Sequence, residues 1–259
     1  LNEMTTKDLS DLKDLKLDNK KVLIPVVEGS VSEDDLKKAF ELEGFEVEQF
    51  IIEQSSFENY QASLDKLAEK IGEVSIFALA HGDYSASVIR NISGLMKFVL
   101  EDTRIKEALE ELKKRQGFII GIGAGMSSLI DAGYFGDIKD DLFFVNNPEN
   151  KYVSTMQDVK VLGKSYLSDE AYEYTAPLSG RMTKLYCKDL EKLQEQVDIL
   201  AINKYNLLDG EAGIDSIQSK CGHVIGIRSI IDRMGQDLYQ NIEVAGYPQH
   251  FKVLRKYFN

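Results

Sequence analysis

The sequence has few cysteines, fewer basic than acidic residues, and no long apolar run. Cys187 and Cys221 are too few for a disulfide framework, and we expect both to be reduced thiols of a cytoplasmic protein. No run approaches the ~20 apolar residues that span a bilayer, so no membrane-spanning segment is expected. The net charge of −12 argues against the basic patch of a nucleic-acid binder. We therefore expect a globular protein with neither a nucleic-acid nor a membrane partner.

The chain alternates short apolar runs with amphipathic segments. Apolar runs at 21–27, 75–80 and 118–122 are typical of buried parallel strands. Apolar residues at helical spacing, as over 60–71 and 105–112, predict helices between them. Such alternation predicts an α/β fold with a mostly parallel sheet and helices on both faces.

The pattern changes after about residue 140. Segments 151–162, 172–177 and 184–187 are strand-like and separated by turns, which predicts a small antiparallel excursion. Residues 224–227 then predict a return to the main sheet. Residues 1–20 are charge-rich and are expected to be a linker or edge segment outside the core, so we place the domain at 21–259.

Three glycines alternate with other residues in segment 117–129, at Gly121, Gly123 and Gly125. The segment predicts a buried strand, a tight turn and a helix start. Such a turn can cradle a phosphate on backbone N–H groups, but the dinucleotide spacing and a later acidic partner are missing. We interpret the glycines as the geometry of a sharp turn, where glycine tolerates unusual backbone angles. A helix start is also expected near Ser32, with Asp35 at the spacing of a capping box.

Several short motifs follow one another from residue 20 to 259. They are Pro25, Gly29 and Glu33; Lys38-Ala39-Phe40; Gly44–Val47; Arg104–Ala108; Gly117–Leu129; Lys204-Tyr205-Asn206; Gly213-Ile214, Ser219 and Gly226; Asp237–Ile242; and Lys256–Phe258. This series resembles the glutamine amidotransferase domain at the C-terminus of large-type phosphoribosylformylglycinamidine synthase, an enzyme of purine biosynthesis. The resemblance implies a class I glutamine amidotransferase-like, flavodoxin-like fold. It also implies synthase domains of the same or a partner chain as partners.

The family's catalytic positions carry residues unsuited to its chemistry. A class I glutaminase needs a thiolate on the turn, a histidine oriented by a glutamate, and an oxyanion hole. On the register of the resemblance, Gly123 stands at the thiolate position, Ile230 at the histidine position and Asp232 at the glutamate position. The oxyanion segment falls on Leu79–Ser85, without a clear glycine pair. The resemblance therefore implies a catalytically inactive domain with a structural or interface role, and no cofactor or metal is expected.

Two alternatives stay open. In the first, the chain is a stand-alone module that binds another small ligand in the former glutamine pocket. In the second, it is a hydrolase with a relocated nucleophile, because His81 follows the third expected strand and Ser127 lies just beyond the turn. Ser127 is expected to point along its helix and not from the turn. Cys221 and His223 share an expected turn but lack the second pair of ligands that a zinc site needs.

Overall fold

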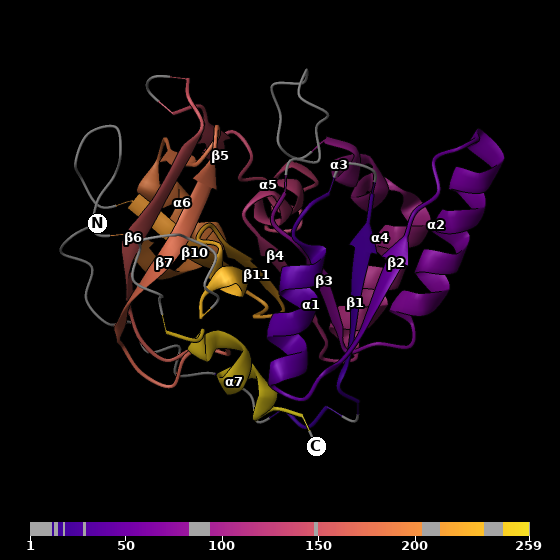
Figure 1. Cartoon of the computed structure of the whole chain (residues 1–259), viewed down its shortest axis with the longest axis horizontal. Helices are drawn as coiled ribbons and strands as arrows, with labels where there is room; N and C mark the ends of the chain where they lie inside the picture. The colour runs from indigo at the N-terminus through magenta and orange to yellow at the C-terminus, as the bar shows by residue number, and fades with distance from the viewer. Residues whose placement is uncertain are drawn as a thin grey trace.

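The computed structural model describes residues 12, 15–17, 19–27, 30–82, 94–147, 150–203, 213–235 and 246–258. Figure 1 labels most of its elements. The strands are β1 (Lys21–Val26), β2 (Glu46–Ile51), β3 (Ile76–Leu79), β4 (Phe118–Ile122), β5 (Leu142–Val145), β6 (Val153–Val161), β7 (Glu173–Gly180), β8 (Lys184–Cys187), β9 (Val197–Asn203), β10 (Gly213–Ser219) and β11 (Val224–Ile227). The helices are α1 (Glu33–Leu42), α2 (Phe57–Ile71), α3 (Gly94–Glu101), α4 (Thr103–Lys114), α5 (Ala124–Asp131), α6 (Leu190–Gln196) and α7 (Gln249–Arg255), with a 3-10 turn, η1 (Ile231–Arg233).

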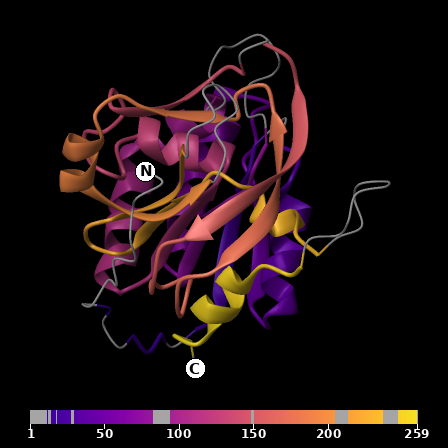
Figure 2. The ribbon, with the colours of Figure 1, turned by 90° about the vertical axis from the view of Figure 1, so that its left-hand side faces the viewer.

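Within the described part of the chain, nine strands form one sheet in the order β2-β1-β3-β4-β11-β10-β9-β6-β7. Pairs from β2 to β11 are parallel, and pairs from β11 to β7 are antiparallel. β11 returns to the sheet beside β4, as expected, and the long β6–β7 pair lies toward the viewer in Figure 2. β5 and β8 form a separate antiparallel pair. The predicted α/β fold is confirmed.

Neighbouring residues of the parallel strands face opposite sides of the sheet. Leu23, Phe77 and Ile119 belong to the apolar cluster that includes α2, α3, α4 and α5. Ile24 and Ile120 belong to the cluster that includes α1 and α7. Figure 1 shows α2 and α4 on the far side of the strands from α1 and α7. Burial on both faces explains why these strands read as continuous apolar runs.

Part of the segment before residue 21 lies in the core. Leu15 and Leu17 are buried, and the N–H of Leu17 donates to the carbonyl of Tyr257 at 3.0 Å. Leu17 also forms an isolated parallel bridge with Phe258. The expectation that residues 1–20 lie outside the core is wrong for these two leucines.

Some of the motifs fall outside the described residues. These are Gly29, Lys204–Asn206 and Asp237–Ile242, and the oxyanion segment is described only as far as Gly82. None of the helices in the described part of the chain is long and apolar enough to cross a membrane.

Candidate functional site

Gly123 forms the sharp turn between β4 and α5. Its backbone has φ +54° and ψ −110°, a region that residues with a side chain rarely adopt. Its N–H donates to the carbonyl of Ile227 in β11 at 2.7 Å, and its carbonyl accepts from the N–H of Ser127 at 3.1 Å. The turn is thereby held by the neighbouring strand and by the helix that follows. This strand–turn–helix geometry is the one that exposes a nucleophile at the carboxyl edge of a sheet.

The glycines on either side of the turn allow close packing of backbone. A Cβ on Gly121 would lie 2.6 Å from the carbonyl carbon of Gly125, and a Cβ on Gly125 would lie 2.6 Å from the carbonyl oxygen of Leu79. α5 therefore rests directly on β4 and β3. This close approach of backbone explains why Gly121 and Gly125 have no side chain, in agreement with the interpretation of a sharp turn.

His81 follows β3, and its imidazole lies against Gly123. A Cβ built on Gly123 would stand 2.1 Å from Nδ1 of His81 and 3.0 Å from its Cγ. Both distances are shorter than carbon and nitrogen atoms allow without a bond, so the ring occupies the space that a side chain at position 123 would need. The structure thus places His81 beside the turn. Its ring also lines a cavity of about 250 Å³.

Ser127 lies one helical turn after Gly123, within α5. Its side chain is buried, and α5 is buried from residue 124 to residue 130. A substrate would have to reach a hydroxyl enclosed by the core. A hydrolase built on Ser127 and His81 stays a prediction, and the burial of Ser127 weighs against it.

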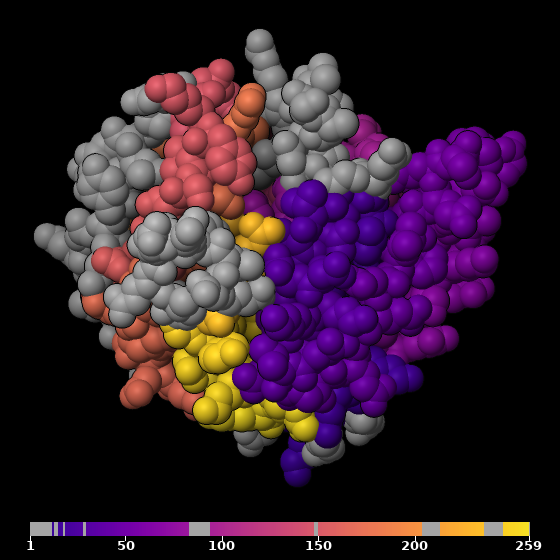
Figure 3. All heavy atoms as spheres, in the orientation of Figure 1, coloured from indigo at the N-terminus to yellow at the C-terminus, as the bar shows by residue number. Residues whose placement is uncertain are grey.

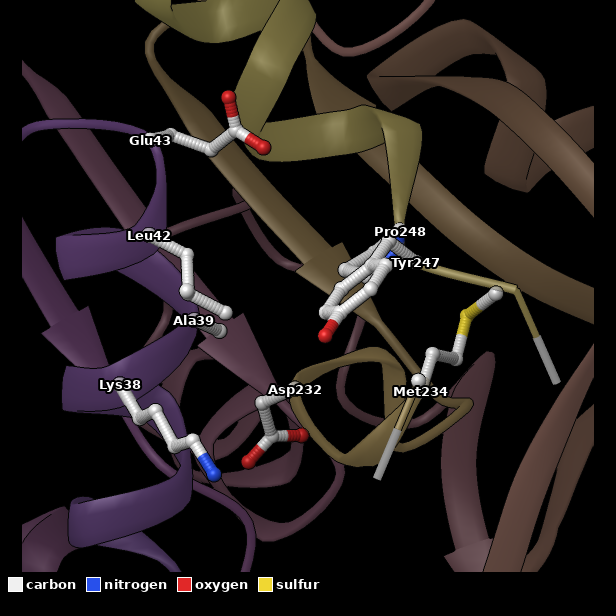
Figure 4. A pocket seen from close by; sticks show the side chains of 9 residues that line it. Lys38, Ala39, Leu42, Glu43, Asp232, Met234, Tyr247 and Pro248 are labelled. Carbon is white, nitrogen blue, oxygen red and sulfur yellow. The ribbon is translucent and has the colours of Figure 1, made fainter. Parts of the chain in front are cut away.

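The segment after β11 carries Ile230 and Asp232. Ile230 is fully buried, and its N–H donates to the carbonyl of Pro177 in β7 at 2.9 Å. Asp232 is also buried, and burial raises its pKa to about 7 although the charge of Arg233 lowers it. Figure 4 shows the Asp232 carboxylate and the Lys38 ammonium group pointing toward each other across a cavity of about 30 Å³. Asp232 thus lines a different cavity from the one that His81 lines.

Arg233 joins η1 to α1. Its Nε donates to Oδ2 of Asp35 at 2.8 Å, and its Nη2 donates to the hydroxyl of Ser32 at 3.0 Å. Ser32 precedes α1 but makes no side-chain capping bond to the helix. The prediction of a capping box is therefore wrong, because the Ser32 hydroxyl and the Asp35 carboxylate accept hydrogen bonds from Arg233 instead of from the backbone of α1. η1 contacts both α1 and β7, and in Figure 1 it lies between them.

A buried ion pair near η1 was not indicated by any motif. Arg228 follows β11 and Asp215 lies in β10, with 3.6 Å between Nε and Oδ1. Arg228 also donates to the carbonyl of Thr183 at 2.9 Å and to the amide oxygen of Gln157, and the Ser229 hydroxyl donates to Asp215. Burial raises the pKa of Asp215 and lowers that of Arg228, because loss of water disfavours either charge. The sequence signal for this ion pair was Asp215 itself, the one charged residue in the β10 segment.

The turn with Cys221 and His223 has a structural explanation. His223 is buried, with its Nδ1 3.0 Å from the carbonyl oxygen of Gly117, while Cys221 is exposed. The described residues contain no group of three or more His, Cys, Asp or Glu side chains placed to hold a metal ion. The sequence interpretation of a turn agrees with this geometry.

The chain was compared with known protein families and structures. A family model described as the CobB/CobQ-like glutamine amidotransferase domain matches residues 19–245. No curated protein matches. The structure of PurLQS from Thermotoga maritima is 16% identical with a TM-score of 0.65, over 92% of this chain and 96% of that chain. The Trypanosoma brucei CTPS glutaminase domain with bound acivicin is 9% identical with a TM-score of 0.53, over 92% and 93%. At these identities the two structures show a shared fold.

Proposed function

Since the chain belongs to the CobB/CobQ-like glutamine amidotransferase domain family, we propose that it is a member that has lost glutamine hydrolysis. Its role is structural: it packs against the synthase domains of a phosphoribosylformylglycinamidine synthase. The synthase then takes ammonia from another source for purine biosynthesis. The proposal extends the relationship to the PurLQS structure, which rests on a common fold.

The observation that carries the proposal is that the turn at Gly123 lacks a side chain and that His81 occupies the space for one. Gly123 has no atom that can attack a carboxamide, and the His81 ring occupies the space where such a side chain would begin. Covalent catalysis needs a nucleophile with an adjacent base. The turn holds neither the nucleophile nor the room for one.

The segment after β11 supports the same conclusion. Ile230 stands where the family places its histidine, and its hydrocarbon side chain cannot accept or donate a proton. Asp232, at the glutamate position, lines the cavity next to α1 and Lys38. His81 lines a different cavity. Loss of the nucleophile at position 123 and of the base at position 230 means that no single substitution restores the triad logic.

Exposed apolar side chains support the interface role. Val31 follows β1, Ile51 ends β2, Phe57 begins α2 and Phe98 lies in α3; all are between 63% and 73% exposed. The first three lie where the parallel strands end, on the edge of the sheet that carries Gly123. Contiguous exposed apolar patches mark protein–protein contacts, and we propose that these four residues belong to one such contact surface.

Release of glutamate from glutamine by the full chain tests the loss of activity. We expect no release above the buffer control, and we expect acivicin to leave the protein mass unchanged. An active glutaminase domain of a CTP synthase serves as the positive control. Glutamate release at an ordinary enzymatic rate would refute the proposal.

Binding to separately purified synthase domains tests the interface role. We expect a Phe57→Ser/Phe98→Ser chain to bind them at least tenfold more weakly than the wild type. Tyr186→Ser, a change at a 43% exposed aromatic residue in β8, is the matched control and should bind normally. Equal binding by all three chains would count against this surface.

A further inference from the structure

The cavity next to His81 is large enough for a small metabolite. It lies between the end of β7 and the residues that follow β1 and β3, with a volume of about 250 Å³. That volume equals the space of about eight liquid waters. η1 contacts both α1 and β7, and Figure 3 shows the face on which α1 and the β6–β7 strands lie on either side of it. The described residues that line the cavity are Val31, His81, Gly82, Tyr152, Ser179, Gly180, Arg181, Met182 and Arg233.

The charged residues among these are all basic, although the whole chain carries a net charge of −12. The guanidinium of Arg233 is already paired with Asp35. Arg181, which is exposed in the turn after β7, has no ion pair or side-chain hydrogen bond to any described residue. Its planar fork of N–H donors matches a carboxylate or phosphate group.

Ser179 provides a second, independent observation. Its side chain is 4% exposed, and its hydroxyl has no hydrogen-bond partner within the described structure. A buried hydroxyl without a partner is costly, so native proteins rarely keep one without a reason such as a ligand or an ordered water. Ser179 stands two residues before Arg181 and lines the same cavity.

We infer that this cavity binds a small organic anion through a carboxylate or phosphate group. Arg181 is the ionic partner and the Ser179 hydroxyl donates a hydrogen bond to the same group. The inference rests on the loss of glutaminase chemistry proposed above, since it gives the former substrate pocket another ligand. The inference also specifies the chemical class of the ligand. Molecules with a net negative charge bind, and the zwitterion L-glutamine, which has no net charge, binds weakly.

Isothermal titration calorimetry on the full chain at low ionic strength tests the inference, with inorganic phosphate, succinate and L-glutamine as probes. We expect phosphate or succinate to bind at least tenfold more tightly than L-glutamine, and the tighter of the two identifies the anionic group. Arg181→Met should weaken that binding at least tenfold and Ser179→Ala about threefold. Lys164→Met removes one positive charge from an exposed residue that does not line the cavity, and should change the affinity less than twofold.

The variants are first compared with the wild type by circular dichroism and thermal unfolding. If Arg181→Met is unfolded, Arg181→Lys keeps the charge without the planar fork and should bind with intermediate affinity. Undetectable binding of both anions, or equal affinity in the arginine and Lys164 variants, overturns the inference. Glutamate release is measured on the same samples: it would refute the proposed loss of activity, whereas absence of anion binding alone would refute only the ligand.

Discussion

Nδ1 of His81 lies 2.1 Å from the position that a Cβ of residue 123 would occupy. The glycine and the histidine are therefore mutually dependent, because any larger residue at 123 requires the ring to move. Position 123 therefore has neither a side chain nor space for one while the ring stays in place.

We expect Gly123→Ala to lower the free energy of unfolding by about 3 kcal/mol, from the positive φ and the overpacking against His81. Gly133 is the matched control, because it has φ +81° with no atom within 4 Å of an added Cβ. Gly133→Ala should therefore lose only the backbone contribution of about 1–2 kcal/mol. Urea unfolding measures both changes, and a Gly123→Ala/His81→Ala chain should recover part of the loss by the logic of a double-mutant cycle. Equal losses in both single variants would contradict the steric explanation.

Restoring the thiol together with its space should not restore catalysis. In a Gly123→Cys/His81→Gly chain, the Cβ clash with the ring is gone, so we expect a folded protein whose new thiol reacts with iodoacetamide. Peptide mass spectrometry separates this thiol from Cys187 and Cys221. We expect no glutamate release, because position 230 remains isoleucine and offers no base. Measurable turnover would show that another group serves as the base.

The raised pKa of Asp232 predicts a loss of stability on alkalinisation. Its pKa is about 7 in the folded chain and near 3.8 in the unfolded one, so between these values only the folded state holds the proton. The contribution of Asp232 to stability therefore falls as pH rises through this window, by about 4 kcal/mol in total as an order of magnitude. Asp232→Asn should remove this contribution, as measured by urea unfolding between pH 4.5 and 8.

His250 opposes this effect over part of the range. Burial lowers its pKa from 6.5 to about 4, so between these values only the unfolded state holds the proton and stability rises with pH. The two contributions nearly cancel from pH 4 to 6.5 in the wild type. Asp232→Asn should therefore lose stability on acidification, and His250→Gln should gain it. Identical pH profiles in both variants and the wild type would contradict the assignment.

Removal of Arg228 should be the most destabilising of these changes. Arg228→Met leaves Asp215 buried without its charge partner, which costs about 3–5 kcal/mol. Arg228→Met/Asp215→Asn removes both charges and should recover a large part of that loss. Thermal unfolding followed by circular dichroism tests both chains. A double variant no more stable than the single one would show that the packing of Arg228, and not its charge, is what matters.

The strands of the sheet were predictable because they are buried on both faces. Runs such as Phe118–Ile122 stay apolar at every position, and the amphipathic segments between them have one apolar face. Motif order along the chain then indicated the family. Gly123 and Ile230 could also be identified from the sequence, because the type of residue at each position of the family's motif is read directly from it.

The contacts within the site were not predictable. His81 and Gly123 are distant in sequence and meet only because β3 and β4 are neighbours in the sheet. Arg233 forms hydrogen bonds with Ser32 and Asp35, the two residues of the predicted helix cap, although about 200 residues of chain separate them. Such pairings depend on where several strand ends converge, and local patterns contain no information about that.

The position of β11 has a consequence for how the chain folds. Among the described residues it is the last strand in sequence, yet it lies between β4 and β10 near the middle of the sheet. During synthesis, the hydrogen-bonded ladder between the parallel and the antiparallel strands therefore cannot be completed until residues 224–227 are made, although one apolar cluster includes strands of both halves. Long-range closure of this kind is slow and leaves exposed edges prone to aggregation. A chain cut before residue 224 would consequently leave β4 and β10 without the strand that pairs with both of them.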